Sequence, residues 1–313
     1  MLTSFFGNSK TTNYILLAVA LPFVLALRWW VEFSALPAIG QGLSLLVQSA
    51  LLILTLLLLD FIIRKNKLTQ PNNYGLWWFF CGITAAADLG NLRQSLFLVL
   101  SLLVLRRIMS FAKEQNLEKK IFDAALWIIM VAAINPWFLW MMLPLYIAIA
   151  QLNQSSGRYF LIPLFSGLCL WLIYAGILVI LPSLGGPFGG ALPLLSLEFA
   201  PIYWSWPSLL WLQIALACGV LLLLATLVRL PLAYKEGTTI RQGHFQWIWR
   251  VLIMTLIIAG FSVDQKQEVF IWLILPLTAI FYANILELRQ PALLRELLAL
   301  LPLALPLTQL LLK

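Results

Sequence analysis

The 313-residue chain is 62% hydrophobic and only 10% charged, with a mean hydropathy of +0.96. A soluble globule of this length cannot bury so much apolar surface, so lipid is expected to solvate most of it. The formal net charge of +8 does not indicate nucleic-acid binding, because the basic residues stand in short connections between apolar blocks, as the positive-inside rule requires. Composition therefore predicts an all-α polytopic membrane protein and no nucleic-acid partner.

The chain begins with two apolar blocks long enough to span a bilayer, at residues 14–30 and 43–63. The first block ends in the aromatic and charged anchor RWWVE rather than in a small-residue cleavage site, which predicts a retained transmembrane helix. Pro22 is expected to kink this helix. The connection LPAIGQG at 36–42 is rich in turn residues and predicts an outer loop.

Four consecutive apolar blocks in the middle of the chain are short, and they cover residues 74–87, 92–105, 121–134 and 137–151. Helices of about fourteen residues reach only about 21 Å, less than the hydrocarbon thickness of about 30 Å. We therefore expect them to thin the bilayer or to line a recess enclosed by protein.

The last two short blocks predict a tight helical hairpin with Asn135, Pro136 and Trp137 at its tip. Asn135 can cap the second arm, and Pro136 can take its first position, where a missing amide proton costs nothing. Because each arm is short, the tip is expected at or just below the outer interface.

The second half of the chain predicts further crossings, at residues 159–181, 208–228, 247–262 and 269–288. An aromatic stretch at 194–206 carries Glu198 and is suited to the headgroup layer. The short connection VDQKQE at 263–268 predicts an outer loop, and the proline-rich segment 293–312 is either a bent span or an interfacial helix. The whole chain, 1–313, is expected to form one membrane domain of ten or eleven helices.

Charge places the amino terminus in the cytoplasm, because about sixteen of the 20 Lys and Arg residues fall on its side of the membrane. At the inner end of the second block, Asp60 precedes Arg64 by one helical turn, which favours an ion pair over a proton relay. Cysteines 81, 169 and 218 are isolated, and the single histidine, His244, has no companion ligands at metal-site spacing. No cofactor or metal is expected.

Four stretches resemble an uncharacterised family of multi-pass inner-membrane proteins of the Bacteroidota. They are the opening MLTSFFGNSKTTN, the basic connection FIIRKNKLTQPNNYG, the central LRRIMSFAKEQNLEKKIFDA and the helix entry RYFLIP. The likeness is good over the first half of the chain, and over the remainder it is limited to the hydropathy pattern. It implies a bacterial inner-membrane location and supplies no established activity.

Polar residues at the outer ends of the expected helices form a candidate site for a lipid headgroup or another anion. They are Arg28, Glu32, Asp88, Asn91, Arg93, Asn135 and Glu198. Arginine there could hold a phosphate of a polyprenyl-linked substrate, and a carboxylate could act as a base. Arg93 is expected to face a polar recess with Asp88, since an arginine beside a short apolar block must be paired or hydrated.

Three functions are open at this point. The favoured one is an accessory or scaffold component of cell-envelope biogenesis, whose apolar faces pack against lipids and partner membrane proteins and whose outer charges are interfacial anchors. The second is an enzyme or flippase-like protein that handles a polyprenyl-linked glycolipid, because the layout loosely resembles membrane glycosyltransferases, although their paired acidic motif is reduced here to Glu32. The third is a small-molecule transporter, which the scarcity of charges within the spans disfavours.

Overall fold

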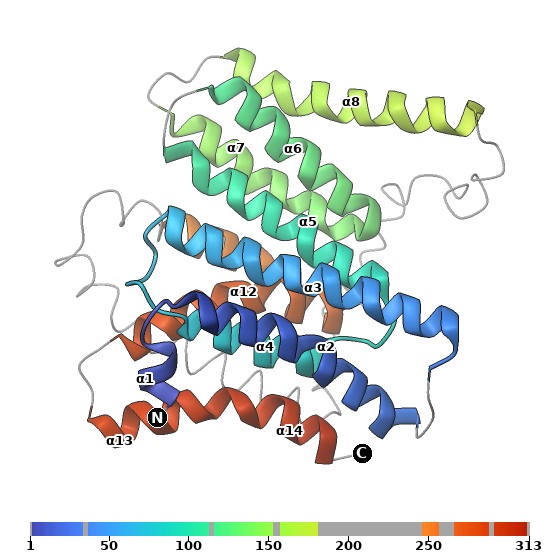
Figure 1. Ribbon diagram of the computed structural model, residues 1–313. Helices are drawn as coiled ribbons and strands as arrows, with labels where there is room; N and C mark the ends of the chain where they lie inside the picture. Colours follow the sequence, from blue (N-terminus) through green and yellow to red (C-terminus); the bar gives the residue numbers. More distant parts are fainter. Residues whose placement is uncertain are drawn as a thin grey trace. The chain divides into compact units, whose positions relative to one another are not determined.

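The computed structural model describes residues 2–33, 37–112, 116–152, 157–180, 246–256, 266–287 and 291–311. In these ranges the regular structure is helical, without a strand (Figure 1). Three of the described helices are long and apolar enough to cross a membrane: α2 (Thr11–Phe33), α3 (Ile39–Lys65) and the Gly157–Gly176 part of α8 (Gly157–Ile180). The all-α class is thereby confirmed for the described part of the chain.

Contacts divide the chain into two compact units. Of the described residues, 2–33, 37–99, 271–287 and 291–311 belong to the first unit, and 100–112, 116–152, 157–180, 246–256 and 266–270 belong to the second. Helix α5 (Leu92–Met109) continues from the first unit into the second.

Helix α4 (Tyr74–Ala86) is the centre of the first unit, and every residue from Tyr74 to Ala85 is buried. It packs against α2, α3 and the C-terminal helix α14 (Ala304–Leu311). A helix that is apolar on all sides must be surrounded by other helices or by lipid. Here other helices of the unit surround it, which explains why a block of only thirteen residues is stable in this position.

Glycines let α12 (Lys266–Leu286) approach α4 closely. A Cβ on Gly82 would lie 2.3 Å from Leu275 Cδ1, and one on Gly75 would lie 3.1 Å from the carbonyl oxygen of Ala279. Between these two glycines, Trp78 Nε1 donates to Thr278 Oγ1 at 3.1 Å. Small residues at a helix crossing allow the close backbone approach that drives association of apolar helices.

The C-terminal segment runs along α4 as a helix interrupted at Pro302. It consists of α13 (Ala292–Leu300), the 3₁₀ turn η5 (Leu301–Leu303) and α14. Trp77 Nε1 donates to the carbonyl oxygen of Ala299 at 2.9 Å, and α14 packs beside α4. Helix α13 contacts α1 (Leu2–Phe6), and α13, η5 and α14 follow one another as one segment bent at Pro302 (Figure 1). The choice between a bent span and an interfacial helix for 293–312 stays a prediction.

The second unit contains the expected helical hairpin. Its arms are α6 (Leu117–Ile134) and a second arm made of η2 (Pro136–Met141) and α7 (Met142–Ala150). Asn135 Oδ1 accepts a hydrogen bond from the backbone nitrogen of Trp137 at 3.2 Å, with Pro136 in the first position. The predicted cap is confirmed, although the second arm begins as a 3₁₀ helix rather than an α-helix.

Helix α8 runs in the same direction as α6, and the two helices start at the same end (Figure 1). Ser166 Oγ donates to the carbonyl oxygen of Phe122 at 3.3 Å, and the two helices make extensive contact. Among the described side chains of α8, up to residue 176, those of Tyr159, Pro163 and Ser166 are buried and the others are at least partly exposed. Helix α8 therefore packs by one narrow edge and presents a wide apolar surface.

Two of the sequence predictions about loops are wrong. The stretch 36–42 is not a loop throughout, because α3 begins at Ile39. Gln41 Oε1 accepts from the backbone nitrogen of Ala38 at 3.0 Å and so stabilises the first helical turn despite its glycines. Likewise Lys266, Gln267 and Glu268, expected in an outer loop, are the first residues of α12.

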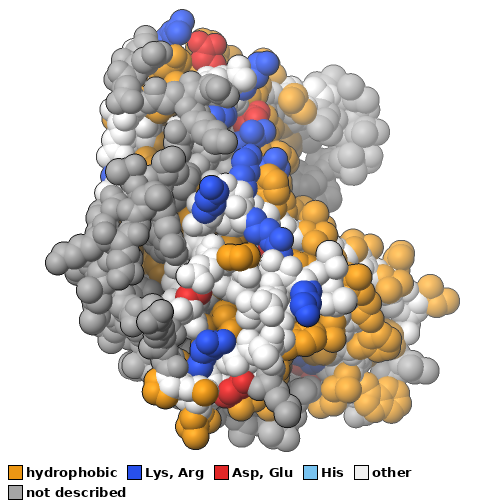
Figure 2. Space-filling model, turned by 60° about the vertical axis from the view of Figure 1, so that its left-hand side comes forward, with side chains coloured by type: hydrophobic (Ala, Val, Ile, Leu, Met, Phe, Trp, Pro, Cys, Tyr) orange, Lys and Arg blue, Asp and Glu red, His pale blue; other side chains and the backbone are white. Residues whose placement is uncertain are grey.

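Figure 2 shows Lys and Arg side chains spread over one face of the molecule, and within each unit several of the described basic residues lie at one end. In the first unit this end carries Lys10 before α2, and Arg64 and Lys65 at the end of α3. In the second it carries Arg107 near the end of α5 and Arg158 at the start of α8. Each unit thus has the asymmetry that the positive-inside rule describes.

Candidate functional site

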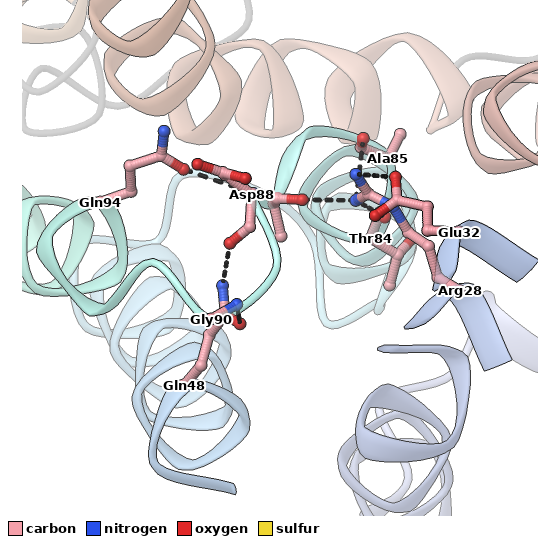
Figure 3. Close-up of polar contacts among 9 residues, drawn as sticks. Arg28, Glu32, Gln48, Thr84, Ala85, Asp88, Gly90 and Gln94 are labelled. Atoms are coloured by element: carbon pink, nitrogen blue, oxygen red, sulfur yellow. Dashed lines mark hydrogen bonds and ion pairs between the residues drawn. The ribbon is translucent and has the colours of Figure 1, made fainter. Parts of the chain in front are cut away.

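Arg28 caps the C-terminal end of α4, and its side chain lies inside the first unit. The residue is only 7% exposed. Its Nη1 atom donates to the carbonyl oxygens of Thr84 at 3.1 Å, Ala85 at 3.3 Å and Ala87 at 2.5 Å (Figure 3). The last carbonyls of a helix have no partner within it and carry the negative end of its dipole. The buried guanidinium of Arg28 donates hydrogen bonds to these carbonyls and places a positive charge at the negative end of the dipole.

Glu32 supports Arg28 from the next turn of α2. Its Oε1 atom lies 3.5 Å from Arg28 Nη2, and both side chains are largely buried. A buried cation needs a counter-charge as well as hydrogen bonds. Glu32 therefore neutralises the charge that the end of α4 holds in place.

Gln48 of α3 fixes the loop that follows α4. Its Nε2 atom donates to the carbonyl oxygen of Asp88 at 2.7 Å, and its Oε1 atom accepts from the backbone nitrogen of Gly90 at 2.8 Å (Figure 3). Gly90 has φ +82°, a conformation that favours glycine. One fully buried amide thus satisfies two backbone groups of a tight turn.

The beginning of α5 closes the same turn. Gln94 Oε1 accepts from the backbone nitrogen of Asp88 at 3.3 Å, and Asn91 Nδ2 donates to Asp88 Oδ2 at 3.1 Å. We call Arg28, Glu32, Gln48, the turn 87–91 and Gln94 the α4 end network. It replaces, with protein groups, the hydrogen bonds that water would otherwise supply to irregular backbone among apolar helices.

The structure brings four of the sequence-predicted site residues together in this network: Arg28, Glu32, Asp88 and Asn91. Arg93 lies beside it, exposed in the first turn of α5. Asn135 belongs to the other unit, where it is buried and caps η2. Glu198 lies outside the described residues.

Sequence reasoning missed Gln48 and the backbone carbonyls that Arg28 binds. Gln48 carried a usable signal, because it is an amide within a nearly continuous aliphatic run, where an unpaired polar group would be costly. The carbonyls of residues 84–87 carried none, since every residue has a carbonyl group.

A second polar cluster lies at the opposite end of the first unit. Tyr14 Oη is 2.8 Å from both Asp60 Oδ1 and Asn73 Oδ1, and it also accepts a hydrogen bond from Arg64. Arg64 Nε lies 2.9 Å from Asp60 Oδ1, so the predicted ion pair is confirmed. The cluster ties the start of α2 to the end of α3 and the residue before α4.

Chemically, the α4 end network resembles a helix cap more than a catalytic site. Its arginine binds backbone oxygens, its glutamate is paired, and its amides bind a turn. Among the described residues, no group of three or more His, Cys, Asp or Glu side chains could hold a metal ion.

Comparisons of the chain with protein-family models, with curated proteins and with solved structures give no match.

Proposed function

We propose that this protein is a multi-pass integral protein of the bacterial inner membrane that acts as a non-catalytic accessory or scaffold component in cell-envelope biogenesis. The observation that supports this most is the α4 end network, because it uses Arg28 and Glu32 to hold the fold. These are the same side chains that a polyprenyl-phosphate enzyme would need for its substrate.

Release of Arg28 to a substrate would be costly. A phosphate would have to compete with three backbone oxygens and a carboxylate, and those oxygens would be left unsatisfied in an apolar environment. A scaffold makes no such demand. It needs helices held in fixed positions and apolar faces for partner helices, and the wide exposed face of α8 is suited to that role.

Charge asymmetry supports a cytoplasmic amino terminus, since each unit carries basic residues at the end where α2, α6 or α8 begins. In a background without native cysteines, single cysteines placed at Lys113 and Lys235 should resist a membrane-impermeant thiol reagent in intact cells. A cysteine at Lys266 should react, because the proposed orientation places that position on the outer side of the membrane. Labelling at Lys113 from outside would reverse the proposed orientation.

Three substitutions separate the scaffold from lipid-linked substrate handling. Glu32→Gln, Asp88→Asn and Arg93→Leu remove the groups that could act as a base or bind phosphate, while the two amides preserve most hydrogen bonding. We expect all three variants, compared at wild-type protein levels, to complement the envelope defect of a deletion strain, although Glu32→Gln removes the counter-charge of buried Arg28 and should be the least stable of them. A photoreactive amino acid at Leu168, exposed on α8, should give a discrete adduct with a protein partner.

Arg93 is the residue on which the alternative depends, since it is exposed beside the network. Loss of function in Arg93→Leu, with partial retention in Arg93→Lys, would favour a bound anionic headgroup, because lysine keeps the point charge. Adducts with lipid alone at Leu168 would count against the scaffold.

A further inference from the structure

A groove between α6 and α8 is lined by two kinds of side chain. It offers about 550 Å³ of space and is broadly open to its surroundings rather than enclosed. Its lining includes the charged side chains of Glu118, Lys119, Asp123 and Arg158 and the apolar side chains of Phe122, Ile162 and Phe165. The groove is therefore amphipathic, like a lipid.

The charged part lies where both helices begin. Glu118 and Lys119 stand in the first turn of α6, and Arg158 is the second residue of α8. Because the two helices run parallel, their positive dipole ends lie at the same end of the groove, next to the cations Lys119 and Arg158. This combination favours a phosphate group.

The acidic side chains are not equivalent. Asp123 Oδ2 lies 2.5 Å from Arg107 Nη2 and is already neutralised. Glu118 Oε1 lies 3.4 Å from Arg158 Nη2, and both side chains are more than half exposed. An exposed pair of this kind contributes little, so Arg158 can exchange it for a phosphate, and Glu118 then needs another cation.

The apolar part continues into the surface of a candidate span. Phe122 and Ile162 are half-buried, and Phe165 is 59% exposed on the Gly157–Gly176 segment. Phe122 lies one turn after Glu118, and Ile162 lies one turn after Arg158, so apolar lining begins one turn beyond these two charges, beside the Asp123–Arg107 pair. An acyl chain placed there would follow α8 into the membrane.

We propose that this groove binds a glycerophospholipid whose headgroup carries a primary ammonium group, with its phosphate at Lys119 and Arg158, its ammonium at Glu118, and an acyl chain over Phe122, Ile162 and Phe165. Charge complementarity selects this occupant, since two cations and one available carboxylate match a phosphate followed by an amine. The site is separate from the α4 end network and does not depend on the proposed scaffold function.

Native mass spectrometry of the full-length protein in detergent tests the proposal. The delipidated protein is mixed with dioleoyl-phosphatidylethanolamine, dioleoyl-phosphatidylglycerol or dioleoyl-phosphatidylcholine at equal concentration. We expect the ethanolamine lipid to bind about threefold to tenfold more tightly than either of the others, and Glu118→Gln to remove this preference. Equal binding of the glycerol lipid by the wild type would overturn the proposal.

Two further variants test the phosphate and acyl positions. The double variant Lys119→Gln/Arg158→Gln should lower ethanolamine-lipid binding by about tenfold, and Ile162→Trp should block the groove without changing its charge. Lys10→Gln, at an exposed lysine before α2, is the matched control and should bind like the wild type. Variants are compared only when they elute as folded protein in gel filtration. Unchanged binding in the double variant, or in a folded Ile162→Trp, would overturn the proposal.

Discussion

In an Arg28→Met variant, the region around α4 should open locally far more often than it does in the wild type. Methionine keeps much of the volume but removes every donor, so the carbonyls of residues 84, 85 and 87 and the Glu32 carboxylate lose their partner. Removing one member of a buried charged network costs about 3–5 kcal/mol. Arg28→Lys should lower the stability of this region by less, because the lysine ammonium group can still bind some of these carbonyl and carboxylate oxygens.

Cys81 provides a direct readout of this opening, because it is fully buried within α4. In a Cys169→Ser/Cys218→Ser background it is the single thiol, and a maleimide dye can reach it only after local opening. A loss of about 3 kcal/mol corresponds to an increase of about a hundredfold in its modification rate.

Arg64→Met is the matched control for Arg28→Met. Arg64 also pairs with an acidic residue one helical turn away, but its side chain is 46% exposed, and exposed pairs contribute about 0–1 kcal/mol. In Arg64→Met, the rate at which the maleimide modifies Cys81 should therefore stay within about fivefold of the rate in the unsubstituted background. Similar rates in the Arg28 and Arg64 variants would show that the α4 end network does not hold the helix.

Gly82→Ala should also destabilise the first unit, although alanine is normally the better helix former. The added Cβ would lie 2.3 Å from Leu275 Cδ1 and 3.0 Å from Leu275 Cγ, so α4 and α12 would have to separate or repack. Overpacking of this kind costs about 1–3 kcal/mol, which lowers the Tm of the detergent-solubilised protein by about 2–8 °C.

Two further variants identify the cause of that loss. Gly176→Ala places a Cβ where nothing lies within 4 Å and should leave the Tm unchanged or slightly raised. On a Leu275→Ala background, Gly82→Ala should have little additional effect, since the clashing methyl groups are gone. Additive losses in the double variant would place the defect elsewhere than at the α4–α12 crossing.

The sequence was sufficient to predict the features that depend on local pattern. Apolar block length predicted the helices, the four-residue spacing predicted the Asp60–Arg64 pair, and Asn-Pro chemistry predicted the cap at Asn135. Turn composition failed at 36–42, because Gln41 supplies a cap that glycine content does not reveal.

Long-range partners could not be predicted in this way. Arg28 looked like an interfacial anchor or a headgroup ligand, yet its partners are backbone oxygens 56 to 59 residues away. No side-chain pattern encodes such an acceptor. The same holds for Gly82, whose role depends on Leu275 of a helix far along the chain.

The position of α4 in the chain also has a consequence for biosynthesis. Arg28 and Gln48 leave the ribosome before α4 does, whereas α12 and α14 follow more than half the chain length later. In the proposed membrane setting, the groups that satisfy the end of α4 are thus already present when this short helix is inserted, and its glycine face is covered last. Early donors and late packing partners give the nascent protein a fixed order of assembly.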